Sequence, residues 1–201
     1  MKEPVNIQEV ATLSPDFMGF IFYEPSHRFV DKDFIISQLD EAIERVGVFV
    51  NSDFDFMIRQ ADKFNFSHIQ LHGHETPELC HRLKLAGLKI IKAFSVDSSF
   101  DFKKVNSFQS VVDFFLFDTK GDQYGGTGKS FNWSLLDKYK LSTPFFLSGG
   151  LNPDNIGQAM SINHPALFAL DLNSGFEERP GLKNVSKLKS AFGKLKSVTK
   201  V

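Results

Sequence analysis

Cysteine is nearly absent from this chain, since Cys80 is the single cysteine among 201 residues. One thiol excludes an internal disulfide framework and a cysteine-rich metal site, and a free thiol fits a reducing compartment, so we expect a cytoplasmic protein. The opening residues MKEPVNIQEV lack the apolar core of a signal peptide, and no apolar run approaches the roughly 18 residues of a membrane span. No membrane contact is therefore expected.

An excess of charge of either sign is also missing, because 23 basic residues face 24 acidic ones. A near-neutral chain has no long-range field to collect nucleic acid, so we expect no nucleic-acid partner and local binding of any anionic ligand. Apolar residues make up 42% of the chain and charged residues 23%, which is typical of globular proteins. No Pro/Gly/Ser-rich linker divides the sequence, and we expect a single domain over residues 1–201.

Short apolar runs alternate with longer amphipathic segments, a pattern typical of βα units. The apolar runs predict seven strands, at residues 16–22, 45–50, 67–71, 89–94, 112–117, 144–148 and 167–171. The amphipathic segments predict eight helices, at residues 3–13, 32–44, 53–64, 76–86, 101–107, 131–139, 152–161 and 184–197. The alternation begins with a helix, so the expected fold is α/β, a (β/α)8 TIM barrel that is missing strand 1.

Polar residues gather at the strand exits, where a parallel barrel carries its functional groups. Asp118 ends the strand VVDFFLFD and is a candidate general acid or base, or alternatively a cap for the following turn. Asp171 has the same place on the last strand and the same two interpretations. Arg28 has the fork geometry that matches a carboxylate, although most loop arginines are simply solvated. His72 in QLHG binds substrate or satisfies a buried backbone group, and its position favours neither.

Two glycine segments follow the last two predicted strands. Gly149 and Gly150 precede the predicted helix at 152–161, and Ser174 and Gly175 follow the final strand. Backbone N–H groups in such loops bind phosphate, especially at a helix N-terminus. The alternative is that these glycines are left-handed turn residues without a ligand. Their occurrence at both of the last two strand exits favours a phosphate site.

The glycine-rich segment at 119–130 contains GGTGK but lacks the glycine spacing and the strand-to-helix context of a Walker loop. A lid that closes over the substrate is the better interpretation, and it includes Gly126. His74 and Glu75 lie side by side, but too few ligand types converge there, and we predict no metal site.

Taken together, the segments MGFIFY, SHRFV, VGVFVN, IQLHG, FDTK, GGTGKSFNW, FLSGGLNPDN and DLNSGFE resemble the phosphoribosylanthranilate isomerase family. The resemblance covers essentially the whole chain in order. It implies an Amadori rearrangement of N-(5-phosphoribosyl)anthranilate in tryptophan synthesis, without metal or organic cofactor, by a monomer or homodimer.

The resemblance also implies roles for individual residues. Asp118 matches the family's general acid, and Arg28 matches its binder of the anthranilate carboxylate. Substrate contacts are also predicted for His72, Gly126 and Asp171. The phosphate loops match the two glycine segments, Gly149, Gly150, Ser174 and Gly175.

One part of the family pattern has no counterpart in this chain. The general base is a cysteine in a Lys-x-Cys-Gly segment at the end of the first strand, whereas this chain opens Met1-Lys2-Glu3-Pro4. Cys80 does not match that position. We therefore expect little or no isomerase activity from the chain as given. Two other interpretations stay open: a noncatalytic phosphosugar-binding relative, and another phosphosugar-metabolising barrel.

Overall fold

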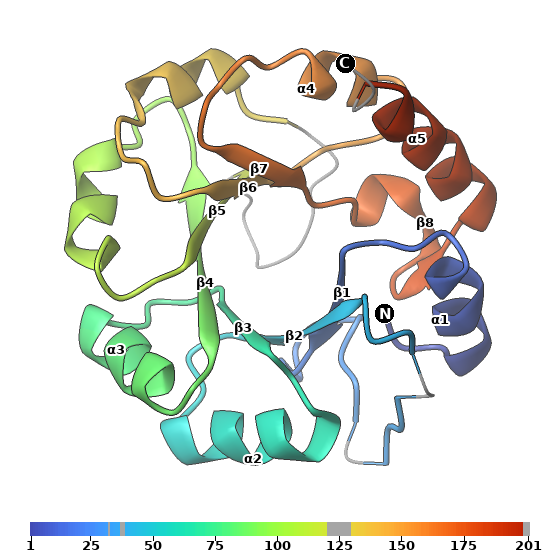
Figure 1. Cartoon of the computed structure of the whole chain (residues 1–201), viewed down its shortest axis with the longest axis horizontal. Helices are drawn as coiled ribbons and strands as arrows, with labels where there is room; N and C mark the ends of the chain where they lie inside the picture. The colour runs from blue at the N-terminus through green and yellow to red at the C-terminus, as the bar shows by residue number, and fades with distance from the viewer. Residues whose placement is uncertain (32, 37–38, 120–129, 199–201) are drawn as a thin grey trace.

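The computed structural model describes residues 1–31, 33–36, 39–119 and 130–198, and it shows a ring of strands with helices outside it (Figure 1). Within these residues, one sheet contains seven strands in sequence order, and each neighbouring pair is parallel. The strands are β1 Phe17–Ile21, β2 Glu44–Phe49, β3 His68–Leu71, β4 Lys89–Val96, β5 Phe114–Thr119, β6 Phe145–Leu147 and β7 Leu167–Leu170. All seven predicted strands and the α/β class are confirmed, with small shifts at the strand ends.

The α-helices are α1 Pro4–Ala11, α2 Phe54–Phe64, α3 Pro77–Leu85, α4 Ile156–Met160 and α5 Val185–Val198, and the 3-10 helices are η1 Phe102–Phe108, η2 Trp133–Lys138 and η3 Ser174–Phe176. The helices predicted at 101–107 and 131–139 are thus 3-10 turns. Asp101 and Asn132 accept hydrogen bonds from the N–H groups two residues ahead, at 3.0 and 3.1 Å, which favours a tight turn over an α-helix. Among the described helices, none has the length and apolar character needed to cross a membrane.

The helix predicted at 32–44 is wrong, since the described residues of this segment form turns and irregular backbone before β2 begins. Asp31 accepts a hydrogen bond from the N–H of Asp33 at 3.0 Å, and Asp40 accepts one from Ala42 at 2.9 Å. Such local bonds compete with helical ones. The apolar side chains that suggested a helix still reach the core, namely Phe34, Leu39 and Ile43.

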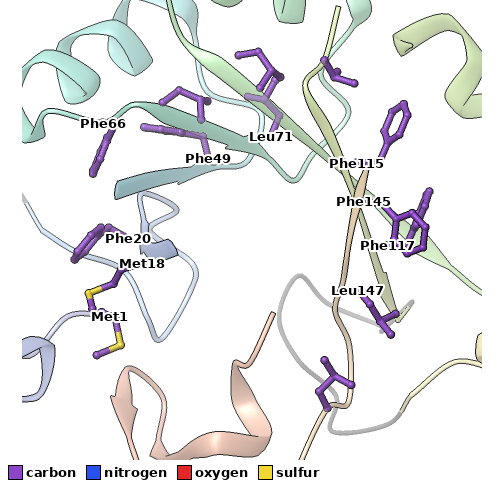
Figure 2. Close-up of a cluster of buried hydrophobic side chains, with 14 of the residues drawn as sticks. Met1, Met18, Phe20, Phe49, Phe66, Leu71, Phe115, Phe117, Phe145 and Leu147 are labelled. Carbon is purple, nitrogen blue, oxygen red and sulfur yellow. The ribbon is translucent and has the colours of Figure 1, made fainter. Parts of the chain in front are cut away.

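Two hydrophobic clusters lie on opposite faces of the sheet. The larger one fills the space between strands and helices and includes many buried aromatic rings (Figure 2), among them Phe20, Phe49, Phe66, Phe115, Phe117 and Phe145. The smaller one lies inside the ring and comprises Val46, Val48, Ile91, Ala93, Leu116 and Phe146. Successive strand residues point to opposite faces. Both faces are apolar, which explains why the strands read as continuous hydrophobic runs.

A short antiparallel hairpin follows β7, with strands β8 Glu177–Arg179 and β9 Leu182–Lys183, and the strand pattern does not predict it. β7 and β1 are not paired with each other within the described residues. The hairpin instead connects the two ends of the sheet. Asn6 in α1 exchanges two hydrogen bonds with the backbone of Lys183, at 2.9 and 2.7 Å. The ring is therefore closed at this point by side chains rather than by a strand ladder.

Candidate active site

A cavity of about 670 Å³ occupies the inside of the ring. At the carboxyl ends of the strands it is lined by most of the residues that the sequence singles out, namely Arg28, His72, Asp118, Gly149, Gly150, Asp171 and Ser174. Deeper inside, the lining is apolar and includes Val46, Ile91, Leu116 and Phe146. Most of the predicted site residues therefore share one pocket, but Gly175 is not among the residues that line it. Gly126 and most of the predicted lid lie outside the described residues.

Asp118 lies at the end of β5, close to His72, which follows β3, and both side chains line the cavity. The distance from His72 Nε2 to Asp118 Oδ2 is 3.4 Å, and the two side chains are 18% and 15% exposed. On its other side, His72 Nδ1 is 3.1 Å from the amide nitrogen of Gln70. Because that nitrogen is a donor, Nδ1 accepts and the ring proton of a neutral His72 sits on Nε2, directed at Asp118.

Asp171 follows β7 on the neighbouring side of the cavity. Burial raises the pKa of Asp171, and the hydrogen bond from Ser148 Oγ to its Oδ2, at 2.9 Å, partly opposes this rise. Asp171 is thus biased toward its protonated form, in which a carboxyl can also donate a hydrogen bond to a ligand. Sequence reasoning missed Ser148, although its place directly before Gly149 at the exit of β6 is a signal for it.

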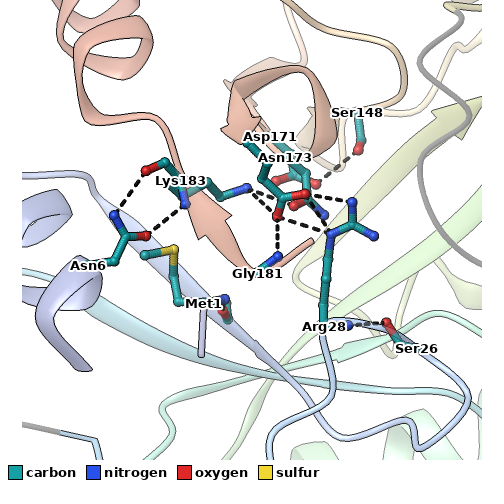
Figure 3. Close-up of polar contacts among 11 residues, drawn as sticks. Met1, Asn6, Ser26, Arg28, Ser148, Asp171, Asn173, Gly181 and Lys183 are labelled. Carbon is teal, nitrogen blue, oxygen red and sulfur yellow. Dashed lines mark hydrogen bonds and ion pairs between the residues drawn. The ribbon is translucent and has the colours of Figure 1, made fainter. Parts of the chain in front are cut away.

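Arg28 lies in the loop after β1, and its guanidinium group is not a solvated fork. It is held by Glu177 of β8: Nε donates to both carboxylate oxygens at 3.0 and 2.9 Å, and Nη2 donates to Oε2 at 2.6 Å. Figure 3 shows Arg28 in this group of polar side chains, together with Asn173 and Lys183. Lys183 Nζ reaches the same carboxylate at 3.3 Å and Asn173 Oδ1 at 2.7 Å. Sequence reasoning missed Glu177 and Lys183, because both belong to the unpredicted hairpin.

The two glycine segments are in contact. Gly149 and Gly150 are buried, with φ of +87° and +68°, and a Cβ at Gly175 would collide with the carbonyl oxygen of Leu151. No described residue accepts a hydrogen bond from the N–H groups of Gly149, Gly150, Ser174 or Gly175. Buried N–H groups without an acceptor are rare in proteins, so the donors of the buried Gly149 and Gly150 are suited to an anion, and those of the partly exposed Ser174 and Gly175 are also available to it.

The helix expected to begin at 152 starts only at Ile156, so no helix N-terminus lies at Gly149 and Gly150. Asn152 Oδ1 accepts the N–H groups of Asp154 and Asn155, at 2.9 and 3.2 Å, and this turn replaces the first helical turn. The side-chain amide of Asn155 donates to the Gly150 carbonyl at 2.8 Å. The candidate anion donors at Gly149 and Gly150 are therefore loop N–H groups, and asparagine side chains hold this loop in place.

A buried ion pair supports the loop that carries His72. Lys92 Nζ contacts Glu75 Oε2 at 3.0 Å, and the two side chains are 3% and 1% exposed. Glu75 accepts from the N–H groups of Asn51 and Gly73, at 2.8 and 2.9 Å. Glu75 therefore holds the turn after β3 together and is engaged by Lys92. A lysine within the apolar strand KIIKAF is the sequence signal that would have revealed this pair.

Comparison with known proteins gives a consistent result. Residues 1–194 match the family model described as N-(5'phosphoribosyl)anthranilate (PRA) isomerase. The N-(5'-phosphoribosyl)anthranilate isomerase of Parabacteroides distasonis is 46% identical over 194 residues, covering 94% of this chain and 88% of the relative.

Solved structures agree with the sequence match. The phosphoribosyl anthranilate isomerase of Thermotoga maritima is 32% identical with a TM-score of 0.82, over 98% of this chain and 96% of that one. A phosphoribosyl anthranilate isomerase in complex with reduced 1-(o-carboxyphenylamino)-1-deoxyribulose 5-phosphate is 28% identical with a TM-score of 0.78. That match covers 98% of this chain and 95% of the other.

Proposed function

Because the chain belongs to the phosphoribosylanthranilate isomerase family, we propose that it converts N-(5'-phosphoribosyl)anthranilate to 1-(2-carboxyphenylamino)-1-deoxyribulose 5-phosphate. This Amadori rearrangement belongs to tryptophan synthesis. One observation carries the proposal: a single cavity is lined by donors suited to two anionic groups and by the carboxyl group of Asp118. The substrate has two anionic ends, a phosphate and a carboxylate, and its reacting ribose lies between these ends.

The phosphate end is assigned to Gly149, Gly150, Ser174 and Gly175. Their N–H groups have no acceptor among the described residues and come from two loops in contact. Several converging backbone donors hold an anion without a local lysine. Gly126 stays a proposed substrate contact from the segment outside the described residues.

The anthranilate end is assigned to Arg28, with Asp171 and His72 as further substrate contacts. Arg28 and Lys183 place two positive charges beside the cavity, the carboxylate of Glu177 opposes one of them, and burial raises the pKa of Asp171. The local balance therefore favours an anionic ligand.

Asp118 is assigned as the general acid. It donates a proton to the ring oxygen of the ribose, so the ring opens and an iminium forms at C1. A base then removes the C2 proton, and the resulting enol becomes the ketone. After Asp118 has given up its proton, the Nε2–H of His72 at 3.4 Å stabilises the carboxylate.

The described sheet corresponds, in this proposal, to strands 2 to 8 of a (β/α)8 barrel, with strand 1 between β7 and β1. The nitrogen of Met1 donates to the carbonyl of Gly19 on β1 at 2.8 Å, which is where such a strand would end. In the family, the base is a cysteine on that strand, and no residue of this chain matches it. Cys80 is unsuited to the role because it is buried on α3 and burial raises its pKa to about 11.

Turnover of freshly generated substrate tests the proposal. The 201-residue chain is compared with a form extended upstream by a strand that ends in Lys-x-Cys-Gly. The extended form should be faster by about 10²–10⁴-fold, the usual contribution of a general base. Equal rates would mean that another group takes the C2 proton. Binding of the reduced product analogue without turnover in either form would favour a noncatalytic phosphosugar-binding protein.

Asp118→Asn in the extended form tests the acid. It should lower kcat by about 10²–10⁴-fold and leave the dissociation constant of the reduced product analogue nearly unchanged. Asp171→Asn is the matched comparison, because it changes the second carboxyl of the same cavity. A larger kcat loss in Asp171→Asn than in Asp118→Asn would transfer the acid role to Asp171.

A further inference from the structure

The carboxylate of Glu177 holds the guanidinium of Arg28 by one edge only. Nε and Nη2 of Arg28 donate to the Glu177 carboxylate at 2.6 to 3.0 Å. The side chain of Glu177 is only 4% exposed and that of Arg28 only 13%. Nη1 has no hydrogen-bond acceptor among the described residues. Because a guanidinium is planar and rigid, fixing one edge also fixes the direction of the opposite edge.

Glu177 is itself held from two further directions. The N–H of Gly181 donates to its Oε1 at 3.1 Å, and Lys183 Nζ approaches the same oxygen at 3.3 Å. Gly181, at φ +88°, allows the tight turn that folds β9 back onto β8. Lys183 is fixed in turn by the amide of Asn6 at its backbone and by Asn173 at its Nζ. The carboxylate that grips Arg28 therefore has a fixed position.

The charges of this group also matter. Glu177 alone would neutralise Arg28 and leave little attraction for a ligand. Lys183 supplies a second positive charge against the same carboxylate, so the three side chains together keep one net positive charge. The ligand meets this charge at Arg28, whose side chain is 13% exposed and lines the cavity.

We propose that Glu177, balanced by Lys183, is a positioning residue that presents the unpaired edge of Arg28 to the carboxylate of the ligand. The inference rests on the proposed function, since it assumes that the anthranilate end binds at Arg28. It adds that the hairpin β8–β9 determines specificity for a carboxylated aromatic ring.

The test uses titration calorimetry on the 201-residue chain with two probes. One probe is reduced 1-(o-carboxyphenylamino)-1-deoxyribulose 5-phosphate, and the other is the same molecule without the carboxyl group. Glu177→Gln should weaken binding of the carboxylated probe by about 10- to 100-fold, the range for a lost charge-assisted hydrogen bond, because loss of the fixed direction of the Arg28 guanidinium outweighs the added positive charge. It should change binding of the decarboxylated probe by less than about twofold.

Glu178→Gln is the matched control, since Glu178 is the neighbouring exposed carboxylate and bonds only Asn184 among the described residues, at 3.2 Å. It should leave the affinity for both probes unchanged. Equal weakening of both probes by Glu177→Gln would mean that Glu177 only maintains the fold, and would overturn the inference. If the unaltered chain bound neither probe, the proposed function itself would fail, which is a different result.

Arg28→Lys covers the case in which Glu177→Gln does not fold. Lysine keeps the positive charge, but its ammonium group has no planar edges, so Glu177 cannot bind one edge while a second edge faces the ligand carboxylate. The same selective loss for the carboxylated probe is expected. Unchanged affinity of Arg28→Lys for that probe would show that orientation of the guanidinium is irrelevant, and the inference would be wrong.

Discussion

The ion pair of Lys92 and Glu75 offers a sharp test of how the site is supported. Lys92→Met keeps most of the side-chain volume but removes the charge from a residue whose Nζ makes four contacts. These contacts are the carbonyls of Leu71, Gly73 and Ala93, at 3.1, 2.8 and 3.0 Å, and Glu75 Oε2 at 3.0 Å. The variant leaves the Glu75 carboxylate buried without a counter-ion.

The expected cost follows from the burial of the pair. Removing one partner of a buried ion pair typically destabilises a protein by about 3–5 kcal/mol, because the remaining charge is uncompensated. Lys84→Met is the matched control, since Lys84 pairs with Asp113 at 2.9 Å but both side chains are far more exposed, at 38% and 27%. Exposed pairs contribute only about 0–1 kcal/mol.

Urea denaturation at pH 7 measures the difference. Lys92→Met should lower the unfolding midpoint by about 1 M or more, given typical m-values for small proteins, and Lys84→Met should shift it only slightly. Adding Glu75→Gln to Lys92→Met should restore part of the loss, because the carboxylate is then neutral while its oxygen still accepts backbone N–H groups. Equal midpoints for Lys92→Met and Lys84→Met would refute the claim that burial makes this pair costly to break.

Two further predictions concern the cavity wall and the opposite end of the ring. Gly149→Ala should lower kcat in the extended enzyme. The Cβ of the alanine would collide with Thr119 N and Asp118 Oδ1, and the φ of residue 149, +87°, is unfavourable for alanine. A kcat equal to that of the unsubstituted enzyme would contradict this packing. His68 donates or accepts at Ser67 Oγ, 2.9 Å away, and burial lowers its pKa below 6.5. The neutral form is therefore favoured in the folded state, so His68 contributes stability above pH 6.5 that is lost as the pH falls toward the folded pKa. Between pH 7 and pH 5, the urea midpoint of the unaltered chain should drop more steeply than that of His68→Gln. The same pH dependence in both proteins would disprove the contribution of His68.

The strands were predictable because both faces of a covered parallel sheet are apolar, which leaves an unbroken signal in the sequence. The helix at 32–44 was not, because Asp31 and Asp40 form local turns that a periodicity count does not detect. In the site, Asp118 and the glycine segments were recognisable from their positions at strand exits. Whether they act as proposed stays a prediction.

The partners of these residues were much harder to foresee. Glu177 contacts Arg28 across 149 residues of sequence, and no local pattern encodes such a pairing. Tertiary geometry alone determines that Glu177 binds one edge of the Arg28 guanidinium. It also determines that the N–H groups of Gly149 and Gly150 have no acceptor among the described residues. Sequence position identifies which side chains reach the cavity, whereas the contacts that orient them require the folded ring.

Closure of the ring by side chains has a consequence for the order of assembly. Each strand pairs with the next one along the chain, about 20 to 30 residues away, whereas the bonds of Asn6 with Lys183 close a loop of 177 residues. Loop-closure entropy makes the long contact about 2 kcal/mol more costly to form. The sheet can therefore grow strand by strand while its ends are still apart. On this order Arg28 meets Glu177 only in the last step, so a nearly complete ring already has its core but does not yet have the ion pair that orients Arg28.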